Sequence, residues 1–304
     1  MWAITPYYNP VRYKRRLSNY RTFRANLGIP LVTVELSFDG EFELTEKDAD
    51  ILIQISGGAV LWQKERLLNL AIKAVPSNIK NIAWIDCDII LKRADWVDEA
   101  KRLLNEFNVI QLFSDVVHLN SEQYNKQSDL YSGHTFVPGI VSLSNARELL
   151  LFGANLEKGS ITYHDGFAWA ANRSLLEDRG FYDAAIVGGG DSLMVAAMYD
   201  RYEGLIRRCL LNATRREHYL RWAIPFHKSV AERVGYVSGT ICHLAHGTIE
   251  NRRYADRHAS LASFNFDPDI DLRIGANGAW QWARSRPEVE SFLVNYFINR
   301  AEDE

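Results

Sequence analysis

Apolar, β-branched segments alternate with helical segments in the N-terminal part of the chain, and this alternation limits the possible folds more than any other feature. Parallel strands need a crossover connection, which a helix usually supplies. The pattern therefore predicts an α/β fold with a mainly parallel central sheet flanked by helices. The expected strands are 2–5, 31–36, 50–55 and 81–90, and the expected helices are 11–27 and 61–74.

The rest of the chain is less regular. We predict further strands at 109–113, 137–143 and 236–244, a helix at 192–199 and a surface helix at 286–298. The sequence shows no repeat, low-complexity tract or linker, so we expect residues 1–304 to form one domain.

Composition describes an ordinary globular protein, with 47% hydrophobic residues and a net charge of -3. This charge gives no global attraction to nucleic acid or to anionic membranes. No segment reaches the roughly 18 apolar residues of a membrane span, and Pro6 interrupts the first apolar run too early for a signal peptide. Three distant cysteines without a CxxC pair suggest neither a disulfide framework nor a zinc site. We therefore expect a cytoplasmic protein.

Two aspartates, Asp86 and Asp88, stand near the end of the strand-like segment 81–90. Side chains at i and i+2 of a strand point to the same face, and ligands of parallel sheets bind beyond the carboxyl ends of the strands. Two carboxylates at such a short separation repel each other unless a cation lies between them. The pair predicts a divalent metal with a phosphorylated ligand, and the alternative is two solvated acids at a strand end.

A second candidate for metal binding is the pair His243 and His246. Imidazole is a common ligand of Mn²⁺-like and softer divalent ions, and two histidines three residues apart converge if the chain turns after its strand. Surface or hydrogen-bonded core histidines are the alternative. Combined with Asp86 and Asp88, the histidines favour a metal site.

The glycine run 188–190 is followed by Asp191 at the expected start of a helix. Three glycines allow a close approach of the backbone and positive φ angles. Asp191 can serve as an N-cap, as a general base that takes a proton from an incoming hydroxyl, or as both.

The order of these motifs along the chain resembles that of GT-A-fold glycosyltransferases, the nucleotide-diphospho-sugar transferase fold. The closest likeness is to the metal-dependent, inverting β-1,4-galactosyltransferase type and its bacterial relatives. The likeness rests on a Pro-aromatic pair after the first strand, a basic residue before Leu-Leu-Asn, Asp-x-Asp, Gly-Gly-acid and ligand-x-x-His, spread over residues 2–258. It implies transfer of a sugar from a nucleotide-diphospho-sugar, above all a UDP-sugar, to an acceptor hydroxyl.

The resemblance also implies roles for individual residues. Asp88, His243 and His246 would bind Mn²⁺ or Mg²⁺, with Asp86 beside them at the metal and the nucleotide-sugar. His243 stands where the family has Met, and this harder ligand extends the expected metal from Mn²⁺ toward Mg²⁺. The implied contacts to the nucleotide or its phosphates are Pro6, Tyr7, Lys64, Arg66, Asn69, Asp86, Asp88, Gly189 and Gly190.

In this interpretation residues 1–110 bind the nucleotide-sugar, residues 111–260 complete the metal and acceptor sites, and residues 261–304 form a helical tail. The chain departs from the family after Gly-Gly, where the family has several acids and this chain has only Asp191 before Ser192. Asp191 is therefore the local candidate for the general base. A loop at 247–258, with Asn251, Arg252 and Arg253, follows the second histidine where the family has a mobile loop.

The acceptor is not specified by the sequence. Tyr163, His164, Asp165 and Trp169 are candidates to line its site, although Trp169 is equally suited to a core. Basic residues gather in the first helix, and they are either a solvated face or an attraction for an anionic acceptor, nucleic acid included. These residues are Arg12, Lys14, Arg15, Arg16, Arg21 and Arg24.

Two other functions fit parts of the pattern. Asp-x-Asp also occurs in metal-dependent phosphatases and nucleases, but haloacid-dehalogenase-type enzymes continue with x-Thr where this chain has Ile89 and Ile90. A nucleotide-sugar binding protein without catalysis is the non-enzymatic alternative, because Asp191 stands alone.

Overall fold

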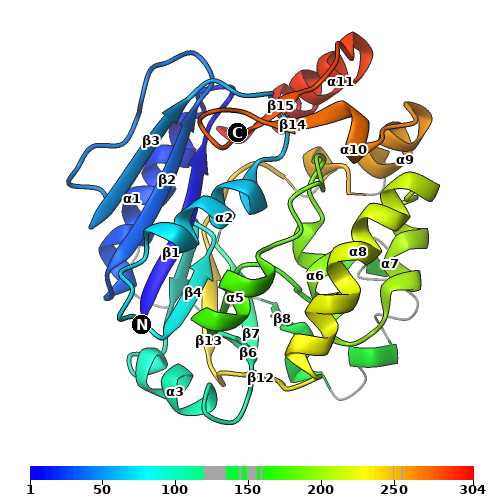
Figure 1. Cartoon of the computed structure of the whole chain (residues 1–304). Coiled ribbons are helices and arrows are strands. Elements are labelled where there is room, and N and C mark those ends of the chain that lie inside the picture. The colour runs from blue at the N-terminus through cyan, green and yellow to red at the C-terminus, as the bar shows by residue number, and fades with distance from the viewer. Residues whose placement is uncertain (120–134, 144–145, 149–155, 158–159, 249, 255) are drawn as a thin grey trace.

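The computed structural model describes residues 1–119, 135–143, 146–148, 156–157, 160–248, 250–254 and 256–304. Its centre is a seven-stranded sheet with the strand order β12-β6-β11-β4-β1-β2-β3, and every neighbouring pair is parallel except the two that β11 makes. The predicted α/β fold with a mainly parallel, helix-flanked sheet is confirmed (Figure 1). The strands are β1 (Trp2–Tyr8), β2 (Leu31–Ser37), β3 (Ile51–Ser56), β4 (Asn81–Ile85), β6 (Val109–Gln111), β11 (Ala168–Asn172) and β12 (Val234–Tyr236).

Helices cover both faces of this sheet. Residues of β1 alternate between two cores, so Ala3 and Tyr7 pack with α1 (Lys14–Leu27) and α3 (Trp96–Leu103). Ile4 and Tyr8 instead belong to the core on the side of α2 (Lys64–Ala74). Figure 1 shows α1 and α2 on opposite sides of the strands. The face on which a β1 residue lies therefore decides which helices it meets.

The first strand is longer than its sequence suggests, because β1 continues through Pro6 to Tyr8. Strand β4 pairs with β1 only as far as Ile4, whereas β2 pairs with β1 to its end. The missing N–H of Pro6 therefore costs no bond to β4, since the two strands have already separated there. The separation opens a crevice at the carboxyl ends of β1 and β4.

A second, four-stranded sheet has the order β5-β13-β7-β8. It joins distant parts of the chain, because β13 pairs with β5 on one side and with β7 on the other. Asp86 and Asp88 lie in the turn between β4 and β5 rather than within one strand, which corrects the expected strand 81–90. The strands are β5 (Ile89–Leu91), β7 (Asp115–His118), β8 (Phe136–Pro138) and β13 (Thr240–His243).

The remaining elements are mainly helical. The expected strand 137–143 is wrong after Pro138, since the backbone turns into the 3-10 helix η2 (Ile140–Ser142). The C-terminal segment holds a hairpin, β14 (Leu272–Ile274) with β15 (Trp280–Trp282), as well as the expected helix, α11 (Pro287–Ile298). The others are α5 (Arg173–Arg179), α6 (Gly190–Met198), α7 (Tyr202–Arg208), α8 (Ala213–Val230), η3 (Glu250–Arg252), α9 (Asp256–Ser263), α10 (Pro268–Asp271), β9 (Leu156–Glu157) and β10 (Ser160–Ile161).

The end of the chain packs back onto its beginning. The hydroxyl of Tyr13 donates to the carbonyl of Ile298 at 2.6 Å, and the backbone N–H groups of Lys14 and Arg15 donate to the carboxylate of Asp303. This docking brings C-terminal side chains to the crevice. No helix in the described part of the chain is long and apolar enough to cross a membrane.

Candidate active site

A cavity of about 180 Å³ lies at the crevice between β1 and β4. It gathers side chains from both halves of the chain and from its C-terminal end. Such a position, beyond the carboxyl ends of parallel strands, is where α/β sheets bind ligands. The residues predicted for the site that line this cavity are Pro6, Lys64, Asp86, Asp88, Gly189, Asp191, His243 and His246.

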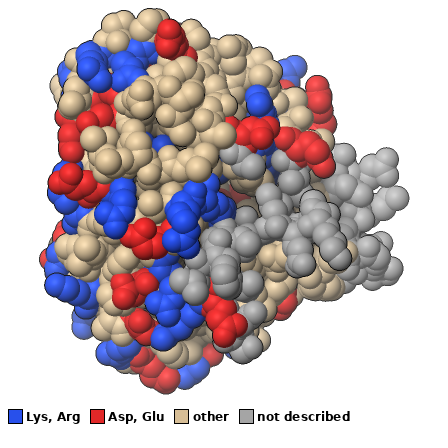
Figure 2. All heavy atoms as spheres, turned by 90° about the vertical axis from the view of Figure 1, so that its right-hand side faces the viewer, with Lys and Arg blue, Asp and Glu red and all other residues tan. Residues whose placement is uncertain are grey.

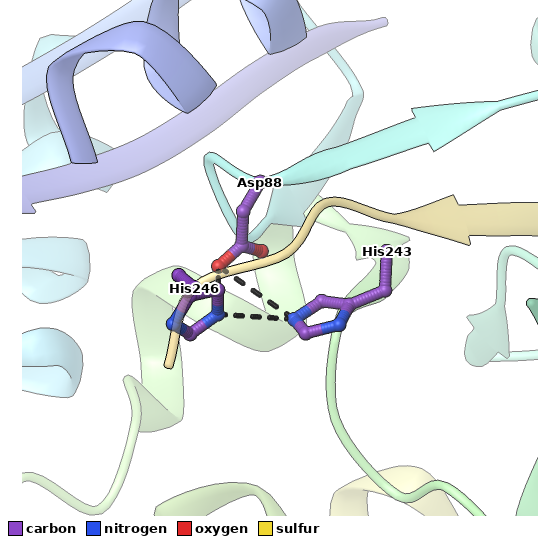
Figure 3. A group of neighbouring side chains, drawn as sticks. All are labelled: Asp88, His243 and His246. Carbon is purple, nitrogen blue, oxygen red and sulfur yellow. Dashed lines mark hydrogen bonds and ion pairs between the residues drawn. The ribbon is translucent and has the colours of Figure 1, made fainter. Parts of the chain in front are cut away.

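Asp88, His243 and His246 converge on one point of the cavity (Figure 3). Asp88 Oδ2 lies 2.8 Å from His246 Nε2 and 3.9 Å from His243 Nε2, and the two Nε2 atoms are 3.1 Å apart. The backbone brings them together, because Leu244 N donates to the carbonyl of Asp88 at 2.8 Å beside the end of β13. One carboxylate and two imidazoles are thus held as a compact set of potential ligands.

The chemistry of this set fits a divalent cation. Asp88 Oδ1 is buried without a hydrogen-bond partner in the described part of the chain, which leaves an acceptor for a cation. Burial lowers the pKa of His243 well below its usual value, and burial followed by the charge of Arg252 lowers that of His246. Both imidazoles are therefore neutral near pH 7, which is the form that binds metals. Burial opposes ionisation of Asp88, but its hydrogen bond with His246 and the charges of Arg252 and Arg16 favour the ionised form, and the pKa of Asp88 is lowered.

Lys64 connects two carboxylates of the cavity. Its Nζ lies 2.6 Å from Asp86 Oδ1 and 2.8 Å from Asp191 Oδ2. Burial raises the pKa of Asp86 to about 7, against the opposing charge of Lys64. Burial would lower the pKa of Lys64, but Asp191 and Asp86 together raise it well above its usual value. The sequence predicted that Asp86 lies at the metal. In the structure its Oδ1 atom instead contacts Lys64.

The glycine run positions Asp191. Gly188 and Gly189 have φ angles of 82° and 93°, which only glycine adopts readily, and Gly189 is the N-cap of α6. Gly190 does not line the cavity but packs on Glu65, whose Oε1 would lie 2.1 Å from a Cβ at this position. The backbone is therefore pressed against α2, and Asp191 projects from the first turn of α6 rather than capping it.

Tyr7 lies on the face of β1 opposite the cavity. Its ring packs edge-on against Tyr20 at 5.3 Å, and its hydroxyl donates to Glu43 at 3.1 Å. Tyr8 lines the cavity instead, with the guanidinium of Arg16 5.6 Å from its ring centre. The period of two along a strand was the signal that would have found it, because Pro6 and Tyr8 share a face.

Arg66 and Asn69 also lie outside the cavity. Arg66 Nη1 and Asn69 Nδ2 each contact Asp183 Oδ2 at 3.0 Å, and the backbone N–H of Phe181 donates to Asn69 Oδ1 at 2.7 Å. These bonds fasten the segment before the glycine run to α2. Both residues act on the site through that segment and do not line the cavity itself.

The sequence prediction did not include several side chains of the cavity. Glu302 pairs with Arg16 at 2.8 Å and Arg300 at 2.6 Å, and its Oε1 lies 3.9 Å from His246 Nδ1. His118 does not line the cavity but contacts His243, one of the candidate metal ligands, from behind. No local pattern marks these residues, since they arrive through the docked C-terminus and the second sheet.

Among the acceptor candidates, His164 and Asp165 line the cavity, whereas Tyr163 and Trp169 are fully buried in the core. Trp169 stacks on Trp84. Asp165 accepts a hydrogen bond of 2.5 Å from the hydroxyl of Ser192.

The basic residues of α1 and the turn before it are largely paired with acids. Arg12 pairs with Asp39, and the others with known acidic partners are Arg16 with Glu302, Arg21 with Asp48 and Arg24 with Asp50. Elsewhere on the molecule, the face drawn in Figure 2 shows basic and acidic side chains interspersed. Apart from Arg16, which lines the cavity, these paired residues favour the solvated-face alternative for α1.

No protein-family model and no curated protein sequence matches the chain. Among solved structures, it is similar to the catalytic domain of Drosophila β1,4-galactosyltransferase 7 in complex with xylobiose, at a TM-score of 0.37 and 11% identity, over 96% of this chain and 98% of that one. A protein of Desulfovibrio desulfuricans described as a nucleotide-diphospho-sugar transferase gives a TM-score of 0.34 and 11% identity, with 80% of each chain covered. Bifunctional IspDF from Campylobacter jejuni gives 0.35 and 14%, over 65% of this chain and 46% of that one.

These solved structures include one described as a nucleotide-diphospho-sugar transferase and one β1,4-galactosyltransferase domain, the class of protein that the sequence motifs resemble. These identities and TM-scores carry no information about activity.

Proposed function

We propose that this chain is a metal-dependent glycosyltransferase that moves a sugar from a UDP-sugar to an acceptor hydroxyl with inversion of configuration. The observation that supports it best is the pairing of two features in one cavity. The first is the group of one carboxylate, Asp88, and two neutral imidazoles, His243 and His246. The second is a separate carboxylate in the same cavity, Asp191, which Lys64 orients.

Asp88, His243 and His246 would hold Mn²⁺ or Mg²⁺. A bound divalent cation supplies a Lewis acid that stabilises negative charge on the departing diphosphate. The guanidinium of Arg252 lies 3.0 Å from His246 and adds positive charge on the same side of the cavity. Because Asp88 contributes one negative charge and the histidines none, the loaded site keeps the positive charge that a diphosphate requires.

Asp191 would act as the general base. Lys64 holds its Oδ2, which fixes the carboxylate and leaves Oδ1 for the acceptor. As the acceptor oxygen bonds to the anomeric carbon from the opposite face, the bond from that carbon to the diphosphate breaks. The hydroxyl proton passes to Asp191 and the bonding electrons leave with the diphosphate.

The walls of the cavity offer surfaces for the nucleotide and the sugar. Tyr8 and Trp62 line it with aromatic rings that lie 6.1 Å apart, edge to face. Gly189 presents a surface without a side chain. The sequence predicted that Tyr7 contacts the nucleotide. We assign this contact to Tyr8 instead, because Tyr8 lines the cavity.

The test is calorimetric titration of UDP, GDP, CMP and their sugars into the protein with Mn²⁺, Mg²⁺ or EDTA. We expect one nucleoside diphosphate to bind with a divalent cation and to lose affinity with EDTA. Absence of binding to every nucleotide under every condition would refute the proposal. Release of inorganic phosphate or of nucleotide monomers from model esters would point instead to the phosphatase or nuclease alternative, and donor binding without turnover across an acceptor panel would favour the non-catalytic binding protein.

A further inference from the structure

Four histidines form a continuous row that starts at the proposed metal ligands. His246 Nε2 lies 3.1 Å from His243 Nε2, His243 Nδ1 lies 3.0 Å from His118 Nδ1, and His118 Nε2 lies 2.8 Å from His164 Nε2. Each distance is within hydrogen-bond range. The two histidines of this row that lie beyond the proposed metal ligands, His118 and His164, have no role in the function proposed above.

The second sheet holds the row in place. His118 on β7 and His243 on β13 are direct partners in a parallel pair, so their side chains stand side by side. The backbone of His164 is tied to the end of β8 and to the residues that follow it. Its backbone N–H donates to the carbonyl of Pro138, and its carbonyl accepts from the backbone N–H of Ile140. The ring of Phe167 packs 4.8 Å from His243 and 4.7 Å from His164. The imidazoles therefore have little freedom to turn away from one another.

Metal binding would fix the protons along this row. A nitrogen–nitrogen hydrogen bond needs one N–H and one lone pair, and a neutral imidazole has one of each. If His243 Nε2 gives its lone pair to a cation, its proton lies on Nδ1 and faces His118, which must accept it. The proton of His118 then lies on Nε2 and is donated to His164. One direction of hydrogen bonding follows for all three residues.

We propose that His118 is a positioning residue for the metal site. It accepts the Nδ1–H of His243 and so keeps His243 Nε2 free to bind the cation, while His164 keeps His118 in the accepting form. The usual acceptor behind a metal-bound histidine is a carboxylate, a backbone carbonyl or a water molecule. An imidazole in that place orients the ligand without adding negative charge, so the loaded centre retains more attraction for a diphosphate. This inference rests on the proposed function only in that the triad binds a divalent cation.

The test is the affinity of the full chain for Mn²⁺, measured by calorimetry, together with the visible spectrum of the Co²⁺-loaded protein. H118F keeps a ring but removes the acceptor, and we expect Mn²⁺ binding to weaken about 10–100-fold. H118N places an amide oxygen near the former Nδ1, so it should restore most of the affinity and the wild-type Co²⁺ spectrum. H218F is the matched control, because His218 on α8 contacts Tyr182 and does not line the cavity.

A second variant covers the case in which H118F does not fold. H164F leaves the ring of His118 in place but removes its acceptor, so it should weaken Mn²⁺ binding in the same direction. If both variants fold and keep the wild-type affinity for Mn²⁺, the inference is overturned. If H118F does not fold, unchanged Mn²⁺ affinity in H164F alone overturns it. In either case, EDTA-sensitive nucleotide binding by the wild type would still uphold the proposed function. If the wild type binds no divalent cation, both are wrong.

Discussion

Lys64 Nζ lies 2.8 Å from Oδ2 of Asp191, the carboxylate proposed as general base. The same ammonium group lies 2.6 Å from Asp86 in the turn that also carries Asp88. One buried cation therefore joins the turn that holds Asp88, a proposed metal ligand, to the first turn of α6. Lys64 thus fixes the orientation of the proposed general base relative to this turn.

Replacing Lys64 with Met should destabilise the protein by up to about 3 kcal/mol, since it leaves the half-buried carboxylates of Asp86 and Asp191 without the cation that they share. Urea unfolding of the metal-free protein measures this. K73M is the control, because Lys73 lies on the exposed side of the same helix. The double variant K64M/D191N should recover part of the stability that K64M loses. An equal loss of stability in K64M and in K64M/D191N would show that the ion pair with Asp191 contributes nothing.

Asp191→Asn should reduce turnover by about 10²–10⁴-fold, because a positioned general base contributes that much to proton transfer. The affinities for metal and donor should stay unchanged, since Asp191 does not belong to the metal triad. Steady-state kinetics combined with calorimetry separates the two effects. D178N on the exposed end of α5 serves as the control, and turnover in D191N at the wild-type rate would remove Asp191 from the mechanism.

His246→Ala removes one of three proposed metal ligands. We expect Mn²⁺ affinity to fall by more than the roughly 10–100-fold that loss of a supporting hydrogen bond costs. Donor binding should become insensitive to EDTA because little metal remains bound. H227A on α8 is the control. The same Mn²⁺ affinity in H246A and in the wild type would exclude this metal site.

The stability of the metal-free protein should fall as the pH rises from about 6.5 to 8, a range above the ordinary pKa of histidine, so that the buried histidines with lowered pKa values no longer act in the opposite direction. Burial raises the pKa of Glu65 to about 8 and that of Asp86 to about 7, both above their ordinary values. Between the ordinary and the raised pKa the folded state binds more protons than the unfolded state, so each group contributes a slope approaching about -1.4 kcal/mol per pH unit. Glu65→Gln cannot titrate and should flatten the curve of unfolding free energy against pH, while E177Q, at an exposed position, should leave it unchanged. An identical slope in E65Q and in the wild type would contradict the assignment.

The sequence was sufficient to predict the central sheet and to predict that Asp88, His243 and His246 lie together, because their positions depend on where buried strands end. It was not sufficient for Tyr8, although alternation along β1 contained that information. Lys64 lines the cavity, and its predicted contact with the nucleotide stays a prediction, whereas Arg66 and Asn69 face Asp183, which only the packing of α2 decides. His118 and Glu302 depend on the register of the second sheet and on the docking of the C-terminus, neither of which leaves a local pattern.

Tyr7 and Tyr8 offer a direct test of which face of β1 binds the donor. Tyr8→Leu removes an aromatic wall of the cavity, and we expect donor binding to weaken by about 1–3 kcal/mol, the contribution of a base–aromatic contact. Tyr7→Leu alters the core beside α1, so it should lower the free energy of unfolding by about 1–3 kcal/mol and leave donor affinity unchanged. Calorimetry with the donor and urea unfolding, performed on both variants, separate the two roles. The opposite result, with donor affinity lost in Y7L and retained in Y8L, would place the nucleotide on the other side of the sheet and refute the assignment of this cavity as the donor site.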